Sequence, residues 1–352
     1  MQIESVGIHS ELFGTVHGRE VTKYVLTNKS GMRVEILSLG ATICAIYVPD
    51  RHGALENVVL SLPKLDDYLE DTAFIGRTIG PVANRIANAH FAIDNQEYSL
   101  ERNDGNHCLH SGTTGLHNKI WLAEHDVSST GVVLNLYVEH AHMEGGFPGN
   151  KQFRASFCLQ HDNTLLLSFH ASSDRMTPVS LTNHAYFNLA GSGNILNHDL
   201  FINSDSITPV DETFIPTKEI LEVSGTAFDF TALKLIGMDI GSQHPQIRSS
   251  CGFNHNFILN KQHDNSAVLS HANSGRQMTV KTDMPGIQLY TSNFLHQAKN
   301  VAGMGLFSQY EGVCLEAQNY PDTPNWPYSA ERWVSPISPY KAYISYHFDV
   351  IE

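Results

Sequence analysis

The chain has 352 residues, with 22 Lys and Arg against 36 Asp and Glu, for a formal net charge of −14. This length can bury a large core, and the acidic balance argues against a nucleic-acid partner, because phosphate backbones are bound by clustered cations. The first residues show no basic segment followed by an apolar run, and no apolar stretch approaches the roughly 20 residues that cross a bilayer, so we expect no signal peptide and no membrane interaction.

The cysteines are odd in number and lack the C-x-x-C spacing of many metal and redox sites. This pattern fits free thiols in a reducing compartment, so a cytoplasmic location is expected. The cysteines are Cys44, Cys108, Cys158, Cys251 and Cys314.

Alternation of apolar and polar residues dominates the chain and predicts β-strands, rich in Val, Ile, Leu, Thr and aromatic residues. In chain order, strands are expected over 21–28, 32–39, 41–48, 132–140, 153–160 and 164–172. Turn pairs between strands are expected at Asp94-Asn95, Asp162-Asn163 and Ser274-Gly275. One short helix is expected over 64–71, and the stretch 341–351 alternates again and should close a sheet.

Strands that follow strands without intervening helices indicate antiparallel sheets packed face to face. The expected fold is therefore all-β, a large antiparallel β-sandwich with few short helices. No linker or fixed-period repeat interrupts it, so residues 1–352 are predicted to form a single domain. A sandwich of this size can bend into a concave face that suits a sugar.

Titratable residues inside apolar patterns mark candidate chemistry. Glu316 interrupts an apolar strand; it is either a partner of a buried arginine or a general base, because a lone buried carboxylate is costly. His184 lies among apolar and aromatic neighbours, as a core histidine or a proton donor. The pair Asn84-Arg85 is either a surface turn or a set of donors for hydroxyl or carboxylate groups.

A glycine-rich loop carries His107, His110 and His117. The spacing offers no cysteine partner and no H-E-x-x-H pattern, so an imidazole presented by the loop is favoured over zinc. No Walker loop, dinucleotide fingerprint or G-x-S-x-G turn is present, so no cofactor is expected. Together these groups suit acid/base chemistry on a neutral polyhydroxyl substrate.

The order of these motifs resembles the aldose 1-epimerase (galactose mutarotase) family, from residue 13 to the closing strand. The matching motifs are VANRIA (82–87), CLHSG (108–112), TNHAYFNLAG (182–191), GTAFDF (225–230), PGIQLYTSNF (285–294) and CLEAQNYPD (314–322). The resemblance implies a β-supersandwich with a sugar cleft and an isomerase that interconverts the α and β anomers of free hexoses such as galactose and glucose, without metal or cofactor.

Residue by residue, the resemblance implies that Glu316 is the catalytic base, His184 the catalytic acid and His110 a second site histidine. It also implies sugar-binding roles for the residues Asn84, Arg85, Asn254 and Gln288. This implies an active form with Glu316 ionised and His184 protonated.

Two positions depart from the family pattern. Asn254 occupies a position where the family usually has an aspartate, which replaces an anionic acceptor by an amide. Pro81 precedes the ANRI run where many relatives carry arginine.

Candidates for stacking on the sugar are Tyr186, Phe294 and Trp326, although core packing is favoured for at least two of them. Two other functions remain open. One is epimerisation of a hexose 6-phosphate, which would need clustered Arg and Lys near the motifs, where chiefly Arg85 and Arg77 occur. The other is a non-catalytic sugar sensor, against which the pairing of a carboxylate with an imidazole argues. A small-molecule aldose is the expected partner.

Overall fold

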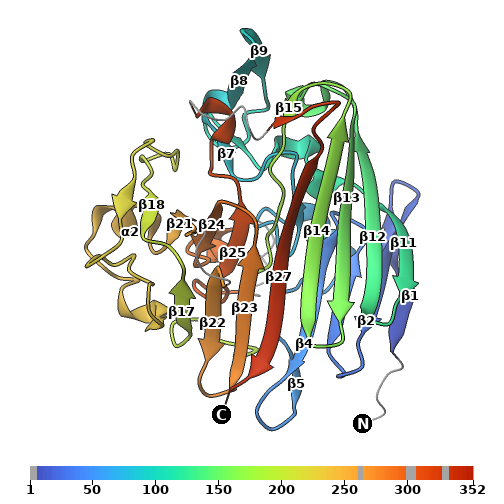
Figure 1. Cartoon of the computed structure of the whole chain (residues 1–352), viewed down its shortest axis with the longest axis vertical. Coiled ribbons are helices and arrows are strands. Elements are labelled where there is room, and N and C mark those ends of the chain that lie inside the picture. Colours follow the sequence, from blue (N-terminus) through green and yellow to red (C-terminus); the bar gives the residue numbers. More distant parts are fainter. Residues whose placement is uncertain (1–5, 261–264, 299–306, 327–332, 352) are drawn as a thin grey trace.

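The largest sheet of the protein is antiparallel and has nine strands (Figure 1). The computed structural model describes residues 6–260, 265–298, 307–326 and 333–351. In β13, buried Phe153, Ala155 and Phe157 alternate with more exposed residues, so one face of this sheet meets the core and the other meets solvent. The strands, in order across the sheet, are β11 (Leu122–Val127), β12 (Gly131–His140), β13 (Lys151–Gln160), β14 (Thr164–Ser173), β27 (Tyr340–Val350), β23 (Arg276–Thr282), β22 (Ala267–His271), β17 (Asp199–Ile202) and β20 (Lys234–Leu235).

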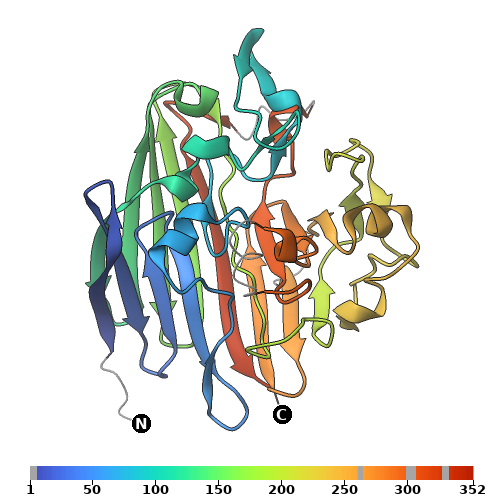
Figure 2. The ribbon, with the colours of Figure 1, turned by 180° about the vertical axis from the view of Figure 1, so that it is seen from behind.

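Two five-stranded antiparallel sheets cover the core face of the large sheet (Figures 1 and 2). One apolar cluster joins all three sheets and includes Ile36, Phe157 and Leu289. The first sheet contains β1 (Gly7–Val16), β2 (Arg19–Thr27), β3 (Arg33–Leu37), β4 (Thr42–Pro49) and β5 (Leu55–Asn57). The second contains β19 (Leu221–Glu222), β18 (Ser206–Thr208), β21 (Asn254–Ile258), β24 (Gly286–Tyr290) and β25 (Cys314–Gln318).

Short strand pairs and helical turns position the loops around these sheets. The pairs are β6 (Thr78–Ile79) with β16 (Thr182–Asn183), β7 (Arg85–Ile86) with β10 (Cys108–Leu109), β8 (His90–Ile93) with β9 (Gln96–Ser99), and β15 (Thr177–Pro178) with β26 (Trp333–Val334). The α-helices are α1 (Leu65–Glu70) and α2 (Pro245–Ser250). The 3-10 turns are η1 (Ala87–Ala89), η2 (Gly112–Thr114), η3 (Leu116–Asn118), η4 (Glu144–Gly146), η5 (Ile236–Met238), η6 (Leu295–Gln297) and η7 (Thr323–Asn325).

The predicted all-β fold is confirmed, and each strand expected from alternation in the first half of the chain is present within a few residues. The turns at Asp94-Asn95, Asp162-Asn163 and Ser274-Gly275 connect paired strands, and α1 matches the expected helix. The strand expected over 341–351 is present as β27, which lies between β14 and β23 and so joins the two parts of the nine-stranded sheet. The single domain over 1–352 stays a prediction.

Within the described ranges, no helix combines the length and the apolar character that crossing a membrane requires. Pro81 follows a cis peptide bond, and it does not line the cavity that Glu316 and His184 share.

A buried arginine connects the large sheet to the hairpin of β4 and β5. Arg276 of β23 is 1% exposed, and its guanidinium donates to the carbonyl oxygens of Val48 (3.3 Å), Leu189 (3.0 Å) and Ala54 (3.2 Å). Its Nη1 also lies 3.0 Å from the half-exposed carboxylate of Glu56. The charge is therefore solvated mainly by backbone carbonyls of the neighbouring hairpin and loop.

Replacing this guanidinium should destabilise the fold. We expect Arg276→Met to lower the free energy of unfolding by about 2–4 kcal/mol, because several buried carbonyls lose a charged donor. Urea unfolding followed by tryptophan fluorescence measures the change. Arg154→Met, on the exposed face of β13, is the matched control and should change stability by less than about 0.5 kcal/mol; equal effects of the two variants would contradict this role of Arg276.

Candidate active site

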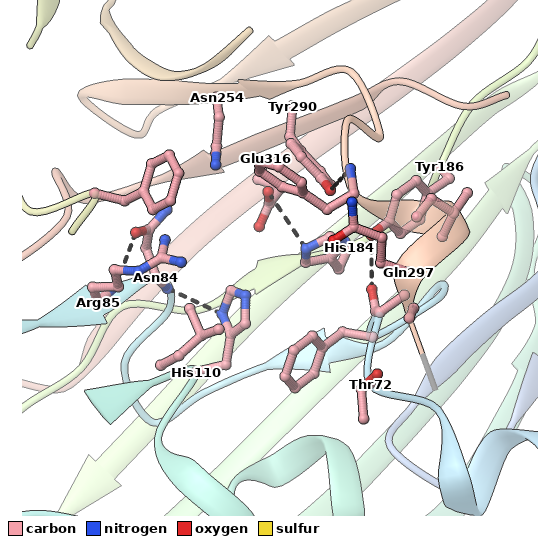
Figure 3. A pocket seen from close by; sticks show the side chains of 17 residues that line it. Thr72, Asn84, Arg85, His110, His184, Tyr186, Asn254, Tyr290, Gln297 and Glu316 are labelled. Carbon is pink, nitrogen blue, oxygen red and sulfur yellow. Dashed lines mark hydrogen bonds and ion pairs between the residues drawn. The ribbon is translucent and has the colours of Figure 1, made fainter. Parts of the chain in front are cut away.

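A cavity of about 290 Å³ opens beside the sheet of β21, β24 and β25 (Figure 3). Its volume is close to the lower end of the range of small-molecule pockets, which suits a monosaccharide. Its walls combine aromatic and apolar side chains with a few titratable and amide groups. The lining residues are Thr72, Ala73, Phe74, Asn84, Arg85, Leu109, His110, His184, Tyr186, Phe214, Asn254, Tyr290, Phe294, Leu295, Gln297, Ala298 and Glu316.

Glu316 reaches the cavity from the middle of β25. Cross-strand register places Asn256, Gln288 and Glu316 beside one another on the same face of the sheet. The Glu316 side chain is buried, and among the described residues its Oε2 has no hydrogen-bond partner. A buried carboxyl oxygen without a partner is costly, so this atom is available to a ligand.

His184 faces Glu316 across a short gap. Its backbone N–H donates to the carbonyl of Arg77 at 2.8 Å, which anchors the segment that follows β16. Its Nε2 lies 3.7 Å from Oε1 of Glu316 (Figure 3). Its Nδ1 lies 3.5 Å from Sγ of the buried Cys314. The imidazole therefore presents Nε2 to the carboxyl group and to the cavity.

The pairing of β7 with β10 brings the third titratable group to the opposite wall. His110 follows β10, and its Nδ1 accepts from the backbone N–H of Asn84 at 3.1 Å. Since Nδ1 is an acceptor, the neutral ring carries its proton on Nε2. The centre of this ring lies 5.4 Å from that of His184. His110 can therefore donate one hydrogen bond to a ligand.

Arg85 is held in place by two contacts at the rim of this wall. Its Nε lies 2.6 Å from Oδ2 of Asp104, and its guanidinium carbon lies 5.0 Å from the ring centre of Phe214. Asn84 adds an amide beside it, whose Oδ1 accepts from the backbone N–H of Arg85 at 2.9 Å. The wall thus offers several fixed donors to hydroxyl groups.

Backbone conformations that side chains rarely adopt gather around this cavity. Non-glycine residues with positive φ line it from several loops, and two of them are bulky phenylalanines. Such conformations concentrate at functional sites, where the surrounding structure must maintain them. The residues are Phe74 (φ 57°), Asn84 (φ 60°), His110 (φ 51°) and Phe214 (φ 64°).

The amide of Asn254 lies on the sheet side of the cavity and is oriented by a neighbour. Gln288 donates from Nε2 to Oδ1 of Asn254 at 2.8 Å, although Gln288 itself is not among the lining residues. The catalytic and sugar-binding residues that the resemblance implied therefore converge on one cavity, Gln288 through its contact with Asn254.

Burial sets the protonation of the facing pair. Burial raises the pKa of Glu316 to about 8, opposed by the nearby charge of Arg85, and lowers the pKa of His184 to about 4. Burial also lowers the pKa of His110 well below its usual value. In the protein alone near neutral pH, the proton of the pair therefore resides on Glu316, whereas the order expected from sequence is that of the active form.

The same side chains have the composition of a divalent-metal site. Ligand atoms of His110, His184 and Glu316 all lie within 4.8 Å of one another, whereas His107 and His117 do not join this group. Imidazole-bound zinc has bonds of about 2.0–2.1 Å, so the three side chains would have to move together to hold an ion.

Several contributors were not identified from sequence. Tyr290 lines the cavity from a motif noted there, and Asp104 orients Arg85, but neither has a local pattern that marks it. Tyr186 and Phe294 line the cavity, whereas Trp326 lies outside the lining and packs on Tyr320 with ring centres 5.7 Å apart.

The burial of Glu316 predicts a stability gain on substitution. Because the folded pKa of about 8 exceeds the ordinary 4.5, the wild-type fold loses stability as pH rises from about 4.5 to about 8. Glu316→Gln, which stays neutral, should be more stable than wild type at pH 9 by on the order of 2–4 kcal/mol and equal to it near pH 4.5. Denaturant unfolding at both pH values checks this, with the exposed Glu212→Gln as a control. A variant less stable than wild type at pH 9 would contradict it.

Comparison with known proteins identifies the family of this chain. The aldose 1-epimerase family model matches residues 22–347. The chain is 39% identical over 301 residues to a galactose mutarotase of Sus scrofa, covering 84% of this chain and 85% of that protein. It is 31% identical over 338 residues to an aldose 1-epimerase of Escherichia coli K12, covering 94% and 96%. The crystal structure of a galactose 1-epimerase from Lactobacillus acidophilus NCFM superposes with a TM-score of 0.89 at 30% identity, covering 99% of this chain and 100% of that one. The chain belongs to the aldose 1-epimerase family.

Proposed function

We propose that this protein interconverts the α and β anomers of free hexoses, with Glu316 and His184 as the base and acid that open and close the sugar ring. The observation that carries the proposal is the 3.7 Å separation of Glu316 Oε1 and His184 Nε2 at the wall of a monosaccharide-sized cavity. The hydroxyl oxygen O1 and the ring oxygen O5 are both bonded to C1. An acid and a base that serve them must therefore lie within a few ångströms of each other.

Ring opening requires two proton transfers and the cleavage of one bond. Glu316 removes the proton from O1, the C1–O5 bond breaks as the C1=O1 bond forms, and His184 gives a proton to O5. Rotation about C1–C2 then presents the other face of the aldehyde, and closure reverses each transfer. Two positioned proton-transfer groups each contribute on the order of 10²–10⁴-fold, and orientation of the sugar adds to this. No hydride transfer or covalent intermediate is required.

One proton on the pair is sufficient for the reaction. Opening transfers a proton to one member while the other member releases one, so the total carried by Glu316 and His184 is unchanged. In the protein alone this proton resides on Glu316. A sugar hydroxyl that donates to the carboxylate favours the ionised form, and the imidazolium that results lies beside it. Binding of the sugar therefore prepares the pair for ring opening.

Galactose is a proposed substrate, since the similar Sus scrofa protein is named a galactose mutarotase. Glucose is proposed beside it as the second free hexose that the sequence motifs imply. Asn84, Arg85, His110 and Asn254 would bind the sugar hydroxyls, and Gln288 would act through Asn254. His110, with its proton on Nε2, would donate toward the ring oxygen and stabilise charge there. The reaction would need no cofactor or metal.

A hexose 6-phosphate is a less suitable substrate. Among the described lining residues, Arg85 is the one permanently charged cation, and its Nε is already paired with Asp104. A non-catalytic sensor is also disfavoured, because binding alone gives no reason to bury a carboxyl group and an imidazole against each other. Following pure α-D-galactose or α-D-glucose to anomeric equilibrium by polarimetry, beside glucose 6-phosphate, separates these functions.

A cytoplasmic location and independence from nucleic acid and membranes belong to the same proposal. The support is the net charge of −14 and the presence of free cysteines, three of which are buried.

Loss of either member of the pair should abolish most activity. We expect Glu316→Gln and His184→Asn to reduce kcat by at least about 100-fold with the fold retained, because each removes one proton-transfer group. His110→Asn should also lower the rate. Polarimetry, corrected for the spontaneous reaction, measures this, and the exposed Glu212→Gln and His125→Asn serve as matched controls. Activity that survives in Glu316→Gln or His184→Asn would remove that residue from the mechanism.

Addition of EDTA should leave the wild-type rate unchanged, because the proposed reaction uses no metal ion.

The one-proton requirement predicts a bell-shaped dependence of kcat/KM on pH. The rate should fall below about pH 4, where His184 is protonated while Glu316 keeps its proton, so that the pair carries two protons. It should also fall above about pH 8, where Glu316 loses its proton and the pair carries none. NMR exchange spectroscopy of the two anomers across this range provides the rates, with circular dichroism to monitor folding. An acidic limb centred near pH 6.5 or a rate that keeps rising beyond pH 9 would exclude this protonation scheme.

A further inference from the structure

A neighbouring side chain sets which atom the amide of Asn254 presents to the cavity. Its Oδ1 already accepts from Nε2 of Gln288 at 2.8 Å, so its Nδ2 is the atom left for a ligand. In Figure 3 this nitrogen is directed into the cavity, toward the space in front of Glu316. In this arrangement the sheet side of the cavity presents a donor rather than an acceptor.

The pair can also adopt the opposite arrangement without losing its hydrogen bond. Oε1 of Gln288 is buried and has no partner among the described residues. If both amides turn over, Asn254 donates from Nδ2 to Gln288 Oε1, and Oδ1 of Asn254 faces the cavity instead. An amide has both a donor and an acceptor, whereas a carboxylate at this position could only accept. The residue at 254 therefore decides whether the site can donate to a ligand here.

The charges of the cavity also favour a neutral amide at position 254. Among the described lining residues, Glu316 is the one acidic side chain, and the charge of Arg85 acts on it. A second carboxylate at 254 would stand on the sheet that carries Glu316, where it would repel an electron-rich substituent of the substrate. The neutral amide avoids this repulsion.

We propose that the Asn254–Gln288 pair extends the substrate range of this site to aldoses whose substituent at the Asn254 contact can only accept hydrogen bonds, such as the carboxylate of a hexuronate. The inference rests on the proposed function and concerns selectivity rather than the acid/base pair. Asn254 is a specificity residue here, and Gln288 is a positioning residue that acts through it.

Sugars in which one hydroxyl is replaced by fluorine are the direct probe, since fluorine accepts weakly and cannot donate. We would measure kcat/KM for anomerisation of galactose and of its 2-, 3-, 4- and 6-deoxyfluoro derivatives by NMR exchange, for wild type and Asn254→Asp. For each protein, kcat/KM for the fluorosugar is divided by kcat/KM for galactose. The quotient of this ratio for wild type over the ratio for Asn254→Asp cancels the intrinsic reactivity of each sugar. At the contacted carbon this quotient should be at least about tenfold, because the aspartate faces a group that cannot donate to it.

The matched control is Asn84→Asp, which makes the same isosteric change in the same cavity, where the amide oxygen already accepts from the Arg85 backbone. Its quotient should stay within about twofold at the carbon that responds to Asn254→Asp. If the contacted carbon is C6, galacturonate should show the same dependence on residue 254. Quotients near one at all ring positions, with galactose itself still accelerated, would overturn the inference alone. No acceleration of galactose by wild type would instead contradict the proposed function on which it rests.

Discussion

The burial of one carboxyl group is the constraint on which the rest of this site depends. Glu316 lies in the middle of an apolar strand, and one of its oxygens has no protein partner among the described residues. Burial raises its pKa to about 8, and the same environment lowers the pKa of the facing imidazole to about 4. The fold thus holds a carboxyl group and an imidazole with one proton between them, which suits a reaction that runs in both directions.

The other side chains of the cavity hold a sugar in position against this pair. Short strand pairs, rather than the large sheets, deliver the loop residues. The β7–β10 pair fixes the tautomer of His110 through the backbone of Asn84, and β16 fixes His184 opposite β25. The nine-stranded sheet supplies the support for these loops, and its outer face makes no contribution to the cavity. This division between a rigid sandwich and loops in rarely populated conformations is typical of functional sites.

Asn254 shows how selectivity can change without any change in the acid/base pair. It lies on the same sheet as Glu316 but reaches the cavity through an amide whose orientation depends on Gln288. One atom at this position determines whether the site can only accept or can also donate a hydrogen bond. A substitution of this kind leaves the chemistry of ring opening in place and alters which sugars reach it.

The sequence by itself determined the all-β architecture, because alternation along each strand directly reports which face is buried. It also singled out Glu316 and His184, since a charge or imidazole among apolar neighbours is costly without a task. Only the tertiary structure decided that these residues, 132 positions apart, lie within 3.7 Å, that Trp326 lies outside the cavity, and that β27 is central in its sheet. It also decided the pKa values of the pair, because the depth of burial depends on the sheets packed around a residue and not on its neighbours in the chain.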